Sequence, residues 1–164
     1  MRVQKKRRME AKTDYAKRIA LLKSNLPRLV FRKTNRYIIS QYVLSESAQD
    51  KVLTGITSKD LIEYGWPKDS QGSLKSIPAC YLTGYLFGKQ ILKEKMQTPT
   101  VDFGMYRMIH KNRQFAFLNG LIDSGLKIKC DKKDFPEKER IEGKKLKKDI
   151  SKEIEKIKSS IDKK

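Results

Sequence analysis

Short apolar stretches bounded by polar turns follow one another three times between residues 28 and 57. They cover residues 28–33, 37–44 and 51–57, and each is rich in the β-branched, aromatic or aliphatic residues that favour strands. Because the connecting segments are short, the three strands are expected to form an antiparallel meander. A fourth such stretch at residues 100–105 predicts one more strand, placed after a helix.

Longer apolar stretches with helical spacing predict two core helices, one from about residue 78 to 95 and one over residues 113–124. The first helix carries small residues at i, i+4 and i+8, a smooth stripe for close packing, namely Cys80, Gly84 and Gly88. Two shorter helices are expected after the capping residues Thr13 and Ser58.

The C-terminal segment regains order after a charged stretch at residues 131–143. Its apolar residues, spaced by 4, 4, 3 and 4, form one narrow helical stripe: Leu146, Ile150, Ile154, Ile157 and Ile161. A helix this short needs a surface to pack on, either the chain's own core or a partner. The linker-like character of residues 131–143 favours the partner.

These elements predict a mixed α/β fold, with about four mostly antiparallel strands packed with two core helices, a basic N-terminal arm and a C-terminal helical tail. The predicted divisions are a basic arm at residues 1–12, a globular core at 13–130, and a charged linker with an amphipathic helix at 131–164. Residues 1–12 show no apolar periodicity, so we expect them to be disordered until bound.

Charge then points to the class of partner. The first 36 residues contain thirteen Lys or Arg and two acids, a local charge of +11 within a net charge of +19. Such a cluster would release counterions from a polyanion on binding, which favours nucleic acid. The arm lacks the apolar face of a helix that lies on a membrane.

Several other functions are disfavoured. The two cysteines and one histidine have no metal-ligand spacing, so neither a metal nor a cofactor is expected. The carboxylates Asp60, Asp102 and Asp123 lie on separate elements, so no active site is predicted, and His110 is expected to be a polar surface residue. With no membrane-spanning stretch and no signal peptide, we expect a cytoplasmic protein without a small-molecule substrate.

The candidate nucleic-acid-binding residues are cations that pair with phosphate, together with a few polar or aromatic side chains beside them. They are Arg2, Lys5, Lys6, Arg7, Arg8, Lys12, Tyr15, Arg18, Arg28, Arg32, Lys33, Asn35, Arg36, Gln41, Lys111 and Arg113. Ser40 could also reach RNA, whereas Asp14 is interpreted as a helix cap. For Tyr15 and Arg18, RNA contact and a purely structural role remain equally open. The other aromatic residues are interpreted as core.

The motif Arg7-Arg-Met-Glu-Ala-Lys-Thr-Asp-Tyr15 resembles the opening of the ribosomal large-subunit protein eighteen family in its archaeal and eukaryotic form. Further matches follow in register at 18–24, 27–33, 63–66, 78–84, 101–104 and 119–126. Each match alone is weak, but their order and spacing together are specific, over about residues 6–145. Residues 108–114 depart from the Pro/Gly/Ser-rich loop of the family.

This resemblance implies a structural protein that binds 5S rRNA and helps attach it to the large rRNA in the central protuberance. It also implies neighbouring ribosomal proteins as partners, and the helix at 146–161 is a candidate contact with them. Two alternatives are a non-ribosomal nucleic-acid-binding protein and an RNA-processing enzyme. Equal affinity for duplex DNA and 5S rRNA would favour the first, and a clustered acidic site would favour the second.

Overall fold

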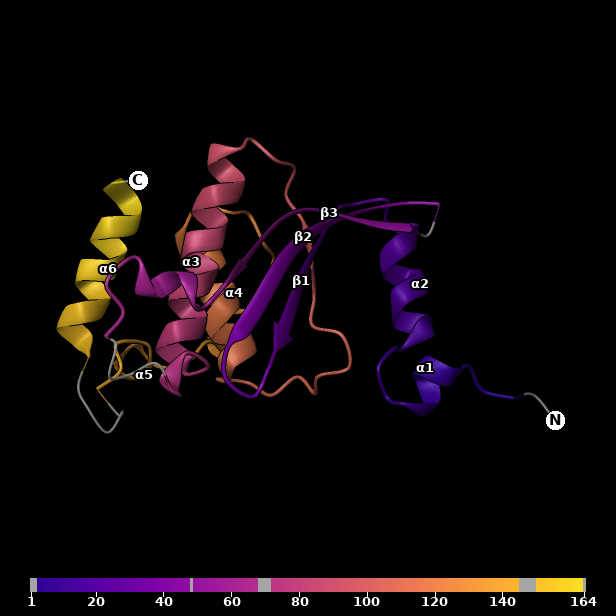
Figure 1. Cartoon of the computed structure of the whole chain (residues 1–164), viewed down its shortest axis with the longest axis horizontal. Coiled ribbons are helices and arrows are strands. Elements are labelled where there is room, and N and C mark those ends of the chain that lie inside the picture. The colour runs from indigo at the N-terminus through magenta and orange to yellow at the C-terminus, as the bar shows by residue number, and fades with distance from the viewer. Residues whose placement is uncertain (1–2, 48, 68–71, 145–149, 164) are drawn as a thin grey trace.

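A four-stranded mixed sheet forms the centre of the computed structural model, which describes residues 3–47, 49–67, 72–144 and 150–163 (Figure 1). The strands are β1 (Arg28–Lys33), β2 (Ile38–Glu46), β3 (Gln49–Thr57) and β4 (Thr100–Asp102). Their order is β3-β2-β1-β4, with antiparallel pairing in the meander and parallel pairing of β4 with β1. The predicted mixed, mostly antiparallel sheet is confirmed.

The two faces of the sheet have different surroundings. On β1, Leu29 and Phe31 are almost fully buried in the hydrophobic core. Because side chains alternate along a strand, Arg28, Val30 and Arg32 project from the opposite face. We call this opposite face the outer face, and it is the face that carries the cationic side chains of β1.

Two helices cover the inner face, α3 (Ile77–Lys93) and α4 (Arg113–Asp123) (Figure 1). They approach closely because glycines lie at their contact. A Cβ added at Gly84 would collide with the backbone carbonyl of Phe117, and one added at Gly120 would collide with that of Tyr81. The small-residue stripe predicted on the first core helix therefore serves helix packing.

The remaining elements are short helices and the C-terminal helix. They are α1 (Lys6–Met9), α2 (Tyr15–Lys23), η1 (Asp60–Ile62), η3 (Lys132–Asp134), α5 (Lys138–Ile141) and α6 (Ser151–Lys163). The cap role interpreted for Asp14 is confirmed, whereas Thr13 and Ser58 do not cap the helices expected after them. Asp14, not Thr13, caps α2, with its carboxylate accepting from the N–H groups of Ala16 and Lys17. The Ser58 hydroxyl instead accepts from the N–H of Ile38.

The C-terminal helix packs on the chain's own core, so the preference for docking on a partner is corrected. Ile154, Ile157 and Ile161 of α6 are each at most 5% exposed and belong to the main hydrophobic cluster. The Tyr85 hydroxyl of α3 donates to Asp162 at 2.6 Å. The sequence did not reveal that α6 covers a further side of α3, in addition to the sides covered by the sheet and by α4. Leu146 lies outside the described residues.

No helix among the described residues is long and apolar enough to cross a membrane.

Candidate nucleic-acid interface

The N-terminal arm lies beside the outer face of the sheet, on the side away from α6 (Figure 1). Neither α1 nor α2 buries a single side chain. Polar contacts hold α2 in place: the Arg18 guanidinium donates to Asp50 at 3.1 Å, and the Lys17 ammonium donates to the carbonyl of Gly104 at 3.2 Å. Helix α2, and with it the arm of residues 1–12 that precedes it, is thus attached by charge and hydrogen bonds rather than by an apolar core.

The expectation that all of residues 1–12 lack structure is corrected by α1, a single helical turn. This turn is fixed locally, because the Arg7 guanidinium donates to the Thr13 hydroxyl at 3.0 Å and Arg8 lies 3.9 Å from the Asp14 carboxylate. Lys5 lies over the Tyr15 ring at 4.5 Å, a cation–π contact. Arg2 lies outside the described residues.

A cluster of ion pairs organises the outer face below the arm. The Arg28 guanidinium lies 2.6 Å from Asp50 and 3.7 Å from Asp102, and Arg32 reaches Asp102 at 3.1 Å. The side chain of Arg28 is only 4% exposed, and its Nε is buried without a hydrogen-bond partner in the described structure. Arg28 therefore orients the two acids from within, which corrects its assignment to an exposed basic patch.

The cluster also shifts the titration of Asp50. Burial raises its pKa, but hydrogen bonds from Ser45 and Arg28 and the charges of Arg28 and Arg18 outweigh burial, so the pKa lies below its ordinary value of 3.8. A carboxylate whose pKa is lowered by folding stabilises the folded state fully above its unfolded pKa. That contribution is lost as the pH falls through the lowered pKa of the folded state.

Replacing Arg28 by Met should destabilise the protein by about 3 kcal/mol at neutral pH, because it leaves the Asp50 and Asp102 carboxylates together without their shared cation. The loss should shrink once the pH falls far enough to protonate Asp50. Thermal unfolding of R28M measures this, with R36M as the control, because Arg36 is exposed. Equal melting temperatures for the two variants would contradict the organising role of Arg28.

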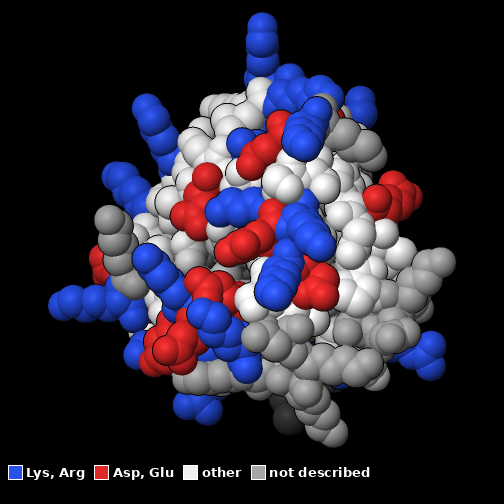
Figure 2. All heavy atoms as spheres, turned by 90° about the vertical axis from the view of Figure 1, so that its left-hand side faces the viewer, with Lys and Arg blue, Asp and Glu red and all other residues white. Residues whose placement is uncertain are grey.

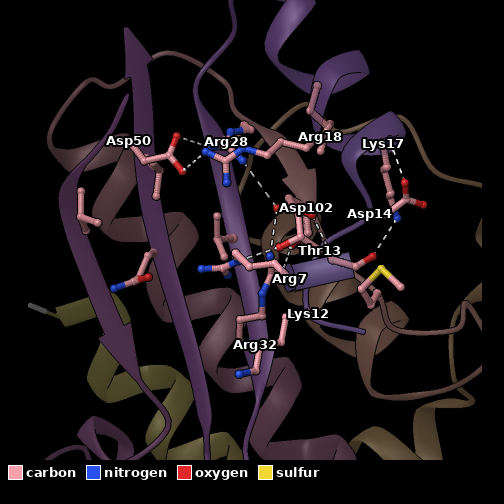
Figure 3. A pocket seen from close by; sticks show the side chains of 17 residues that line it. Arg7, Lys12, Thr13, Asp14, Lys17, Arg18, Arg28, Arg32, Asp50 and Asp102 are labelled. Atoms are coloured by element: carbon pink, nitrogen blue, oxygen red, sulfur yellow. Dashed lines mark hydrogen bonds and ion pairs between the residues drawn. The ribbon is translucent and has the colours of Figure 1, made fainter. Parts of the chain in front are cut away.

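Between the arm and the outer face lies a cleft with a volume of about 220 Å³ (Figure 3). Its charged lining comprises six cations and three acids: Arg7, Lys12, Lys17, Arg18, Arg28, Arg32, Asp14, Asp50 and Asp102. Gln41 of β2 also lines the cleft. The fold thus brings cations from α1, α2 and β1 to one cleft, whereas the sequence showed only that they follow one another along the chain.

Other predicted contacts gather at a second hollow, also of about 220 Å³, on the far end of β1. Lys33 and Arg113 line it together with Arg107. Lys75 connects the β1–β2 turn, which carries Asn35 and Arg36, to this hollow. Its ammonium donates to the Asn35 carbonyl at 2.7 Å, and its own carbonyl accepts from the Arg113 guanidinium at 2.7 Å. The predicted basic residues therefore form two surfaces, which we call the arm cleft and the turn hollow.

Some predicted residues lie elsewhere or have other partners. Lys6 and Arg8 are exposed on α1, and Lys111 lies 3.9 Å from Glu137. Ser40 is fully buried on the inner face, so the suggestion that it reaches RNA is wrong. Sequence reasoning also missed Lys75, Arg107 and Lys17 as site residues. Lys17 had a detectable signal, because it neighbours Arg18 on the predicted helix.

The aromatic and titratable residues outside these surfaces have structural roles. The rings of Tyr81, Tyr85 and Phe117 are buried in the core, as expected. His110 lies 2.8 Å from the Asp134 carboxylate and stacks on Phe115, as an exposed polar residue. Among the described residues, no group of three His, Cys, Asp or Glu side chains is placed to hold a metal ion.

Comparison with known proteins decides which family this basic α/β fold represents. Residues 1–100 match the family model described as ribosomal large subunit proteins 60S L5 and 50S L18. The chain belongs to this family.

Archaeal relatives extend the match beyond residue 100. The large ribosomal subunit protein uL18 of Korarchaeum cryptofilum is 40% identical over 142 residues, covering 87% of this chain and 71% of the relative. The uL18 of Methanoculleus marisnigri is 42% identical over 138 residues, covering 84% and 77%. That of Methanoregula boonei is 35% identical and covers 96% and 92%.

Membership of the ribosomal L5/L18 family makes this chain a structural, non-enzymatic protein of the large ribosomal subunit. This membership explains why the candidate site gathers cations from several elements of the fold. It also removes the two alternatives, a non-ribosomal nucleic-acid-binding protein and an RNA-processing enzyme. The ribosomal resemblance predicted from the motif at residues 7–15 is confirmed.

Proposed function

We propose that this protein binds 5S rRNA and helps attach it to the large rRNA in the central protuberance of the large subunit. The arm carries the proposal. Neither α1 of the arm nor the following helix α2 buries a side chain, yet together they hold cations over a sheet face that carries further cations. A segment without its own core gains most of its order from the partner that it binds, and here that partner has to be polyanionic.

The charge distribution on the opposite side of the molecule also indicates that RNA binds on the arm side. Figure 2 shows the α6 side, where red acidic side chains are interspersed with blue basic ones over the centre of the face. Helix α6 itself alternates Lys with Glu and Asp. Mixed signs give little net attraction for phosphate, so the RNA belongs on the arm side.

Recognition of one folded RNA then requires the two basic surfaces together. Phosphate contacts position a protein without distinguishing sequences, whereas two separated surfaces can match one RNA shape. The proposed contacts on the arm side or around the turn hollow are Lys5, Lys6, Arg7, Arg8, Lys12, Tyr15, Arg18, Arg32, Lys33, Asn35, Arg36, Gln41 and Arg113, with Arg2 at the start of the arm. Lys111, which lines neither hollow and lies 3.9 Å from Glu137, is a further proposed contact. Arg28 acts by positioning its neighbours.

Replacing Arg32 and Arg36 by Ala should weaken binding of 5S rRNA more than binding of a generic RNA duplex. Arg32 lies at the arm cleft and Arg36 beside the turn hollow, so the variant damages both surfaces at once. Competition titrations with the two RNAs at one salt concentration measure the ratio.

The matched control replaces Lys152 and Lys156 of α6 by Ala, which removes the same charge from the opposite side. That variant should bind 5S rRNA almost as the natural protein does. If the Arg32 and Arg36 variant loses affinity for both RNAs equally, the two surfaces bind RNA only through non-specific attraction of positive charge.

A further inference from the structure

A third hollow, which we call the β4 groove, lies along the edge strand β4 and has a volume of about 840 Å³. Its lining includes Phe103 and Leu118, each 6% exposed, and Val101 of β4. Leu26 and Met108 also line the groove, and they are 41% and 43% exposed. Exposed aliphatic side chains next to a buried apolar floor make a surface that loses free energy when it is covered.

The charge of the groove has one sign. Three lysines line it, Lys17 from α2 and Lys127 and Lys129 from the segment after α4, and no Asp or Glu is among its lining residues. This differs from the arm cleft, where acids pair with the cations. An occupant that brings carboxylates would meet these cations at the edge of an apolar contact.

The edge of the sheet adds a third feature. Within the described part of the chain β4 pairs only with β1, so its other side carries no neighbouring strand. Such an edge accepts an extended peptide through main-chain hydrogen bonds, with side-chain pockets giving selectivity. The groove volume of about 840 Å³ lies within the range of about 300–1,000 Å³ that is typical of ligand-binding clefts.

We propose that the β4 groove docks an extended segment of a neighbouring protein that combines apolar side chains with Asp or Glu. RNA fits the groove less well, because its aliphatic lining exposes no aromatic ring for base stacking and its one ring, Phe103, is buried. This protein contact goes beyond the proposed binding of 5S rRNA and does not depend on it.

Photo-cross-linking in assembled large subunits tests the docking. Thr98, which is exposed and lines the groove, is replaced by the photoreactive amino acid p-benzoylphenylalanine, and Met108 is replaced in a second preparation. Mass spectrometry of the cross-linked products should identify one and the same protein segment from both positions, with apolar residues and Asp or Glu at the linkage. Cross-links to rRNA alone, or no cross-link from either position, would overturn the proposal.

Charge reversal sharpens this test. With the probe at Thr98, changing Lys127 and Lys129 to Glu should lower the cross-link yield about tenfold, because like charges then face each other across the contact. The control changes Lys152 and Lys156 of α6 to Glu and should leave the yield unchanged. Both variants are compared in subunits that contain equal amounts of the protein. Equal yields in the two variants would overturn the acidic character of the partner.

Discussion

Removing residues 1–12 is expected to weaken binding of 5S rRNA by orders of magnitude while leaving the fold intact. The deletion takes away six cations, namely Arg2, Lys5, Lys6, Arg7, Arg8 and Lys12. Among the described residues it touches no buried side chain, because α1 buries none. If every deleted cation neutralises one phosphate, the slope of log affinity against log salt should flatten by about four to five units, since roughly 0.7–0.9 counterions are released per phosphate.

Filter binding over a range of salt concentrations measures both effects. A second variant, in which the same six residues are changed to Gln at full length, separates charge from chain length. Both variants should melt at the temperature of the natural protein and should show the same flattened slope. An unchanged affinity and slope in both would show that the arm is a solubilising tail.

Removing residues 144–164 is expected to lower the melting temperature of the free protein by about 10 °C or more. The deletion removes four buried isoleucines, Ile150, Ile154, Ile157 and Ile161, each worth about 1.5–3 kcal/mol before the cost of ordering the helix. It also exposes Tyr81 and Tyr85 of α3. For a chain of this size, 1 kcal/mol corresponds to about 2–4 °C.

Two point variants test whether the loss of stability comes from the buried side chains of α6. Ile157→Ala, at a side chain that is 1% exposed, should cost about 2–5 kcal/mol. Lys156→Ala, at the exposed neighbouring position, should be nearly neutral. Thermal unfolding of the free protein compares the three. If the deletion leaves the melting temperature unchanged, α6 belongs to a partner, as the sequence alone had favoured.

Local patterns predicted the elements of this fold well where one sequence signal dominates. The strands around Leu29 and Ile38 follow from apolar runs between polar turns, and α3 follows from an apolar stretch with helical spacing. The error at the C-terminus has a different origin. The isoleucine stripe predicted a helix that needs a surface, but which surface it uses depends on how α3 is covered in three dimensions. The charged stretch before α6 resembles a linker, and this resemblance favoured a partner over the chain's own core.

The site was predicted in composition but not in geometry. A run of Arg and Lys reveals a polyanion partner, because net charge is additive along the chain. It does not reveal that Arg28 lies inside an ion-pair cluster while Arg36 lies outside, since this depends on Asp50 and Asp102 arriving from β3 and β4. Lys75 links the β1–β2 turn to Arg113 of the turn hollow only because the fold brings its ammonium beside Asn35 and its carbonyl beside Arg113.

Ultraviolet cross-linking of native large subunits, with both the RNA strand and the peptide identified, tests the central claim most directly. We expect 5S rRNA to be linked to peptides within residues 3–36, from the arm and the β1–β2 turn, and not to peptides of α6. Linkage of those peptides to the large rRNA alone, or linkage of 5S rRNA to α6, would contradict it.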